Sequence, residues 1–187
     1  LAVMAAAAVW NGGASAQTAG KRANVLLGAK SWAYQLTNLT PENQARIAAS
    51  SFDLVVIDYT RALSGSAGQI PLTREEVATM QKKPDGSRRV VIAYLSIGES
   101  EDYRYYWRPE WFKHKPVWNG KESKEWKGNY LVQYWNPDWQ RIIYGGPGSY
   151  VDRIIDAGFD GFYLDRVDAY YRYGDTKEAR DRMATFV

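Results

Sequence analysis

Apolar runs alternate with amphipathic segments along this chain of 187 residues. Strands of a parallel sheet are buried on both faces, so they read as nearly continuous apolar runs bounded by turn residues. Five runs fit that description, at 24–29, 52–57, 89–95, 130–134 and 159–164. The pattern predicts an α/β fold.

Helix signals lie between these runs. Thr40-Pro41-Glu42 opens a helix to about residue 50, and Thr73 with Glu76 forms a capping box at the start of the next. Two further helices are expected at 138–157, in two pieces split at 145–148, and at 176–187. Alternating strands and helices favour a parallel sheet with right-handed crossovers. No glycine-rich phosphate loop follows the first run, which disfavours nucleotide binding.

The composition of the chain disfavours or excludes several classes of function. The 8 Trp and 14 Tyr provide far more apolar surface than a disordered chain would carry. A net charge of +3 without a long Lys/Arg run gives nucleic-acid binding little support. The absence of Cys excludes disulfides and thiolate sites, and the single histidine, His114, lies between two lysines with no nucleophile elbow in the chain.

The first residues resemble a processing segment. Residues 1–16 read as the apolar tail of a signal peptide that ends in Ala-Ser-Ala, and residues 17–23 read as a linker before a domain at 24–187. This predicts a secreted or periplasmic protein with no membrane span in the mature chain. The alternative is an Ala-rich leader in a cytosolic protein.

Polar and aromatic groups gather where the predicted strands end. They are residues 31–34, Asp58 with Tyr59, residues 96–99, and residues 165–168. Function sits at the C-terminal ends of strands in parallel α/β barrels. Separate helix caps and turns would explain each group singly, whereas a shared rim explains all of them.

Carboxylates at one rim have three uses: glycoside cleavage, a hard-cation site, or a groove for a cationic ligand. Flat aromatic rings beside carboxylates favour a sugar, whose ring face is apolar and whose hydroxyls need polar partners. The rings near these ends, or in the long segment at 100–128, are Trp32, Tyr34, Tyr59, Tyr94, Trp107, Trp111, Trp118, Trp126 and Trp135. About half of them could instead pack the core.

Five segments together resemble glycoside hydrolase family 114, in particular its secreted prokaryotic branch, once labelled cysteinyl-tRNA synthetase-related. The matching segments are 31–36, 54–59, 93–103, 134–140 and 158–170. The resemblance implies an endo-α-1,4-polygalactosaminidase-like enzyme with a (β/α)8 TIM barrel. It also implies that this chain holds only about the first five β/α units of that barrel.

The resemblance implies that Asp165 is the catalytic nucleophile and that its partner Glu lies on a later strand. The family's Pro-Asp-Asn is Leu164-Asp165-Arg166 here, which leaves the sugar open. Glu99 is the best second catalytic carboxylate within the chain. The predicted substrate-binding residues are Trp32, Tyr34, Asp58, Tyr94, Trp107, Tyr163 and Asp168.

We therefore expect a secreted glycoside hydrolase that binds an amino-sugar polysaccharide and uses neither a cofactor nor a metal; its oligomeric state stays open. The main alternative is a non-catalytic carbohydrate-binding or polysaccharide-processing barrel. A metal-dependent hydrolase built on Asp58, Glu99 and Asp165 is disfavoured because no His ligand accompanies them.

Overall fold

The computed structural model describes residues 27–61 and 69–187, which form a mixed α/β fold. The predicted signal remnant at 1–16, the linker at 17–23 and most of the loop after Arg61 lie outside the described residues. The chain divides into two compact units. The first runs to Tyr94 and includes 154–163, and the second comprises 95–153 and 164–187.

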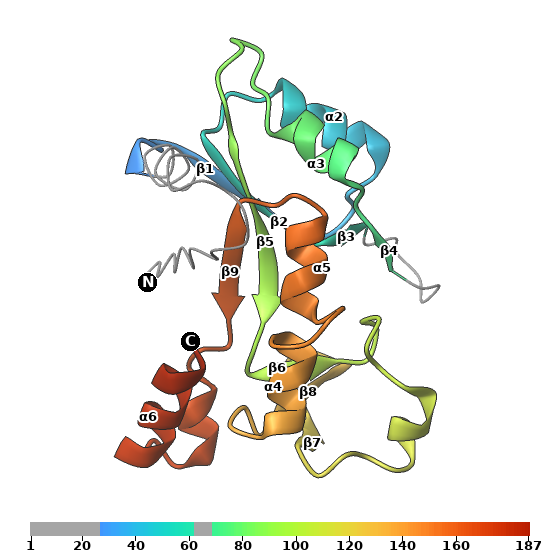
Figure 1. Ribbon diagram of the computed structural model, residues 1–187, viewed down its shortest axis with the longest axis vertical. Coiled ribbons are helices and arrows are strands. Elements are labelled where there is room, and N and C mark those ends of the chain that lie inside the picture. The colour runs from blue at the N-terminus through green and yellow to red at the C-terminus, as the bar shows by residue number, and fades with distance from the viewer. Residues whose placement is uncertain (1–26, 62–68) are drawn as a thin grey trace. The chain divides into compact units, whose positions relative to one another are not determined.

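A four-stranded sheet provides the frame of the first unit, and two of its strands continue into the second (Figure 1). In spatial order its strands are β1 (Trp32–Gln35), β2 (Leu54–Ile57), β5 (Val90–Ser96) and β9 (Gly161–Asp165). β1 pairs parallel with β2, and β2 with β5. All seven residues of β5 are buried, as expected for a central parallel strand.

The predicted first strand at 24–29 is wrong where the structure describes it. Leu27 is helical and 85% exposed, and the strand begins only at Trp32. Of the described part of this run, Leu27 and Gly28 are exposed, whereas the alternating Trp32-Ala33-Tyr34 segment has a partner strand. Trp32 and Tyr34 therefore lie within a strand and not beyond its C-terminal end.

Helices α2 (Pro41–Ala49) and α3 (Arg74–Met80) lie side by side in this unit (Figure 1). Both begin as predicted. Thr40 Oγ1 accepts from the Asn43 amide, and Thr73 and Glu76 form the reciprocal capping box. A short antiparallel ribbon completes the unit, formed by β3 (Thr60–Arg61) and β4 (Ile70–Pro71).

One face of the sheet carries an apolar cluster. Residues two apart on a strand share a face, and Val56, Val90, Ile92 and Tyr94 are buried together there with less than 8% exposure each. The partly buried side chains of Leu36, Leu54 and Tyr163 pack against them. This cluster fixes which faces of β2, β5 and β9 are turned toward the apolar core.

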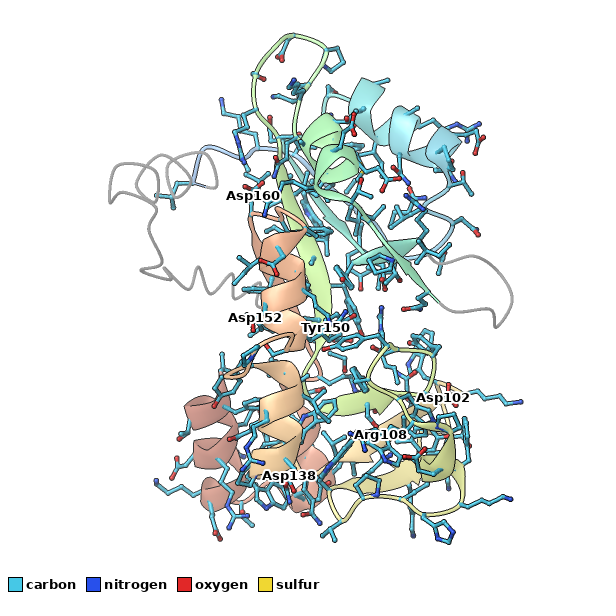
Figure 2. All side chains as sticks on the ribbon, turned by 45° about the vertical axis from the view of Figure 1, so that its right-hand side comes forward. Asp102, Arg108, Asp138, Tyr150, Asp152 and Asp160 are labelled. Carbon is cyan, nitrogen blue, oxygen red and sulfur yellow. The ribbon has the colours of Figure 1, made fainter. Side chains whose placement is uncertain are left out.

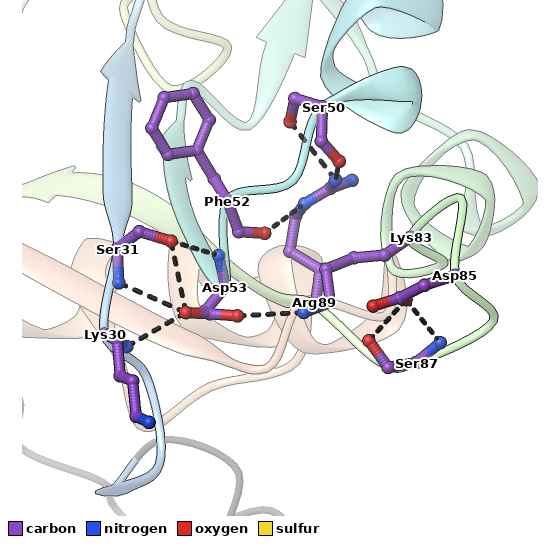
Figure 3. A network of polar contacts seen from close by, with 9 residues as sticks. All are labelled: Lys30, Ser31, Ser50, Phe52, Asp53, Lys83, Asp85, Ser87 and Arg89. Carbon is purple, nitrogen blue, oxygen red and sulfur yellow. Dashed lines mark hydrogen bonds and ion pairs between the residues drawn. The ribbon is translucent and has the colours of Figure 1, made fainter.

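A polar network lies at the N-terminal ends of β1, β2 and β5 (Figure 3). Asp53 Oδ2 accepts from the amides of Lys30 (2.9 Å) and Ser31 (3.1 Å), and Lys83 Nζ lies 2.8 Å from Asp53 Oδ1. The hydrogen bond from Lys83, with those from Lys30 and Ser31, holds the pKa of Asp53 far below its usual value. The carboxylate thereby ties the starts of two strands together.

Arg89 completes this network from the residue before β5. It is fully buried, and its Nε donates to Phe52 O (2.9 Å) and its Nη2 to Ser50 O (Figure 3). Its Nη1 donates to Met80 O (2.6 Å). Every nitrogen of the guanidinium thus has a main-chain carbonyl as partner. Such complete pairing is what makes a buried arginine tolerable.

The second unit contains an antiparallel sheet. Its strands are β6 (Glu99–Glu101), β7 (Asn119–Glu122) and β8 (Asn129–Val132), in the order β6-β8-β7. The predicted fourth parallel strand at 130–134 is therefore wrong in its pairing, because this segment runs antiparallel to β6 with Ser100 opposite Tyr130. Its alternation, with Tyr130 and Val132 buried and Leu131 half-buried, suits a one-sided antiparallel strand.

Short helices complete this unit, and none of the helices that the structure describes is long and apolar enough to cross a membrane. They are η1 (Pro109–Phe112), α4 (Pro137–Ile143), the start of α5 (Tyr150–Asp156), η2 (Ala169–Tyr173) and α6 (Lys177–Phe186). The predicted break between α4 and α5 at 145–148 is confirmed, and Figure 2 marks Tyr150 at the start of α5.

Candidate functional site

Asp165 is the last residue of β9, as the sequence predicts. Its carbonyl accepts from the Ile97 amide (3.1 Å), which lies just beyond the end of β5. The Ile97 carbonyl in turn accepts from Trp139 Nε1 (2.9 Å), a fully buried indole on α4. The half-buried Asp165 thus lies at the carboxyl end of β9, and its carbonyl is fixed by the hydrogen bond from Ile97.

The turn after Asp165 has a strained backbone and a tight contact. Arg166 has φ 61°, a left-handed conformation that costs free energy in a residue with a Cβ atom. Gly98 lies against it: a Cβ at Gly98 would come 2.3 Å from the Arg166 carbonyl oxygen and 2.6 Å from the Ala169 Cβ. Only glycine allows this approach.

Glu99 lies beside that turn, at the start of β6. Its side chain is only 4% exposed, and Oε1 lies 2.6 Å from Arg166 Nη2. Asn129 Nδ2 donates to the other oxygen, Oε2 (3.3 Å). The structure therefore brings together Glu99 and the residue that follows Asp165, although 67 positions separate Glu99 from Arg166.

One donor in this cluster is unsatisfied. Arg166 Nε is buried, and no described residue accepts a hydrogen bond from it. Leaving a buried donor unpaired costs about 1–3 kcal/mol. Strain and unpaired polar groups concentrate at functional sites, where the surrounding structure enforces them. Asp168, also predicted for the site, lies in the same turn but is exposed and makes no side-chain cap to η2.

Three predicted sugar-binding rings meet in the first unit. Trp32 and Tyr34 are 55% and 48% exposed and lie edge to face with ring centroids 6.5 Å apart. Tyr34 lies edge to face with Tyr163 at 5.7 Å. Two exposed rings on one strand, with a third beside them, offer a stacking surface of the kind that binds sugar.

Asp58 and Tyr94, the other predicted residues of this unit, are buried. Asp58 Oδ1 accepts from the amide and the hydroxyl of Thr60, both at 2.7 Å, which is the turn geometry typical of Asp after a strand. Tyr94 belongs to the apolar cluster on the sheet. A single rim shared by Asp58, Glu99 and Asp165 stays a prediction.

Trp107 lies in a cluster of rings in the second unit. Its ring stacks on Tyr130 (4.8 Å between centroids) and contacts Trp111 (5.5 Å) and Phe112 (5.3 Å). Its Nε1 is buried and, among the described residues, has no hydrogen-bond partner. The half-buried ring therefore helps pack the segment at 100–128; a role in binding substrate stays a prediction.

Two acidic residues follow Glu99 on the same segment. Glu101 is buried, with Arg104 Nε donating to its Oε2 (2.6 Å) and the Tyr103 hydroxyl to its Oε1 (2.6 Å). Burial raises the pKa of Asp102 above its usual value, and the Tyr130 hydroxyl donates to its Oδ2 (3.3 Å). Both carboxyls therefore form hydrogen bonds to side chains of the segment at 99–130 and help to stabilise it.

No three His, Asp or Glu side chains converge as a metal site would need within residues 27–61 and 69–187.

Sequence reasoning missed the part played by Gly98, Asn129 and Arg166. The sequence marks Arg166 only as a departure from a family pattern, and Gly98 as a glycine between a strand and a carboxylate. An isolated glycine at such a point signals a close backbone approach. Nothing in the sequence says which backbone approaches it.

Comparison with known proteins identifies the relatives. The model of glycoside-hydrolase family GH114 matches residues 13–187. An uncharacterized protein of Methanocaldococcus jannaschii is 45% identical over 153 residues, covering 82% of this chain and 40% of that protein. An uncharacterized protein of Thermotoga maritima is 41% identical, covering 83% of this chain and 46% of that protein. The chain thus spans less than half the length of these relatives.

Solved structures show a similar fold. Aspergillus fumigatus Ega3, in complex with galactosamine, superposes with a TM-score of 0.54 at 22% identity, covering 83% of this chain and 51% of that chain. The glycoside hydrolase domain of PelA from Pseudomonas aeruginosa superposes with a TM-score of 0.57 at 18% identity, covering 85% of this chain and 54% of that chain. At such low identity the likeness concerns the fold.

Proposed function

Because the chain belongs to glycoside hydrolase family GH114, we propose that the protein hydrolyses an amino-sugar polysaccharide, with Asp165 as the nucleophile. The observation that carries the proposal is the place of Asp165: a carboxylate at the carboxyl end of β9, a strand of the four-stranded sheet, in a chain of this family. The exposed rings of Trp32 and Tyr34 support a sugar as the ligand. An α-1,4-galactosaminan is the proposed polymer, in line with the galactosamine bound by Ega3.

We further propose that β1, β2, β5 and β9 belong to a (β/α)8 barrel in the full-length protein, and that the protein acts outside the cytoplasm. The parallel pairing of β1, β2 and β5 supports the barrel. The apolar segment at 1–16 with its Ala-Ser-Ala ending supports export. The acid/base partner of Asp165 is proposed to lie on a later strand of that barrel.

The test compares Asp165→Asn with the unaltered full-length protein on partly deacetylated α-1,4-galactosaminan. An amide cannot form the covalent intermediate, so turnover should fall at least about 1,000-fold while the melting temperature is kept. Asp181→Asn on α6 is the control, since that carboxylate is 60% exposed. Near-normal hydrolysis by Asp165→Asn would refute the assignment. Affinity for the polymer without any turnover by the unaltered protein would favour the non-catalytic carbohydrate-binding alternative.

A further inference from the structure

The main chain after Asp165 is held from several sides within the second unit. The Ile97 amide donates to Asp165 O (3.1 Å), and the Ala169 amide closes the turn onto Arg166 O (3.0 Å). Gly98 lies so close that any side chain there would meet Arg166 O at 2.3 Å. The segment that follows the nucleophile therefore has little freedom to shift away from residues 97–98.

Side chains add a second restraint to the same turn. Arg166, in its left-handed conformation, places Nη2 2.6 Å from Glu99 Oε1, and Asn129 donates to Oε2 (3.3 Å). Each oxygen of Glu99 thus already accepts a hydrogen bond. A general acid holds its proton on such an oxygen and directs it at the substrate. A buried carboxylate paired with a guanidinium is instead suited to hold that guanidinium in place.

We propose that Glu99 and Arg166 are a pair of positioning residues that fix the backbone of Asp165 for catalysis. Glu99 anchors Arg166, and Arg166 holds the turn that begins at Asp165. This inference rests on the proposed function and gives Glu99 a different role from the proton transfer that the sequence suggests. It predicts that the two side chains act as one unit.

A double-mutant cycle tests this with Glu99→Gln, Arg166→Asn and their combination in the full-length protein. Asn tolerates the left-handed conformation, so Arg166→Asn removes the ion pair without adding backbone strain at residue 166. Each single variant should lower kcat about 10–100-fold, as loss of a supporting partner does elsewhere, with KM little changed. The double variant should be no worse than the poorer single one. Arg166→Lys should restore part of the lost kcat, because it restores a cationic donor to Glu99.

Arg172→Asn is the matched control, since this arginine is 54% exposed and lies in η2 of the same turn region. Normal activity of Arg166→Asn together with at least a 1,000-fold loss in Glu99→Gln would overturn the proposal and make Glu99 an acid/base catalyst. Multiplying losses in the double variant would overturn it as well.

Amide hydrogen exchange gives a readout that does not depend on hydrolysis. The Ile97 and Ala169 amides should exchange about tenfold faster in Arg166→Asn than in the unaltered protein, and should not change in Arg172→Asn. Unchanged exchange in Arg166→Asn would overturn the positioning role even if activity falls. If the unaltered protein hydrolyses no galactosaminan, the proposed function fails, and exchange still decides whether Glu99 and Arg166 hold the turn.

Discussion

The fully buried Arg89 and the partly buried Arg166 differ in how completely their guanidinium groups are paired. Arg89, just before β5, directs all three guanidinium nitrogens at main-chain carbonyls and is fully buried. Arg166, just after β9, has a left-handed backbone, an ion pair with a buried carboxylate, and a buried Nε that has no acceptor within residues 27–61 and 69–187. Each guanidinium nitrogen of Arg89 has an acceptor, whereas Arg166 combines a strained backbone with a buried Nε for which no described residue is an acceptor.

This difference indicates that Arg89 stabilises the fold, whereas Arg166 helps to form the proposed active site. At the N-terminal ends of the strands, Arg89 and Asp53 join chain segments through hydrogen bonds to main-chain groups. At the end of β9, the fold keeps an unfavourable conformation next to the proposed nucleophile. Natural proteins retain such costs where the geometry serves function. The following predictions test whether the contrast holds.

The largest expected effect on stability comes from Arg89→Met. One buried and two partly buried carbonyls lose a charged donor, at roughly 1–3 kcal/mol each, so the free energy of unfolding should fall by about 3–5 kcal/mol. Urea denaturation measures it. Arg141→Met is the control, since that arginine is 70% exposed and should change stability by less than about 0.5 kcal/mol. A loss in Arg89→Met no greater than in the control would remove the basis of the comparison.

Trp107 and Trp32 offer a second comparison, between a ring that packs the fold and a ring proposed to bind sugar. Trp107→Ala should destabilise by about 3 kcal/mol, because the ring is part of a packed cluster. Trp32→Ala should cost about 1 kcal/mol or less, since the ring is 55% exposed, and should weaken binding of galactosaminan oligosaccharides. Thermal melts and titration calorimetry on both variants measure the two effects. Equal stability losses with unchanged binding would assign both rings to packing.

The smallest effect is a pH dependence at Asp53. The pKa of this carboxyl is lowered in the folded protein, chiefly by Lys83, so its contribution is present above the unfolded value of about 4 and is lost as the pH falls below that. Asp53→Asn should therefore be less stable at pH 7, and the gap to the unaltered protein should narrow between about pH 4 and pH 2. Urea midpoints across that range measure it. A gap independent of pH would show that the charge of Asp53 contributes nothing.

Local sequence determined the elements whose signals are local. The caps at Thr40 and Thr73 fix where two helices begin, since a side-chain oxygen there pairs with an amide three residues on. The continuous apolar run in β5 is readable because a central parallel strand is buried on both faces. The same logic placed Asp165 at the end of β9.

Tertiary structure decided what depends on a partner distant in sequence. The run at 24–29 is as apolar as a strand, but the pairing strand lies along Trp32–Gln35, and residues 130–134 belong to a segment that pairs antiparallel with β6. The contact of Gly98 with Arg166, and the ion pair of Arg166 with Glu99, follow from bringing the end of β9 against residues 97–99. A sequence shows which side chains are able to pair. Pairing contributes free energy only between groups that the folded chain brings within contact distance.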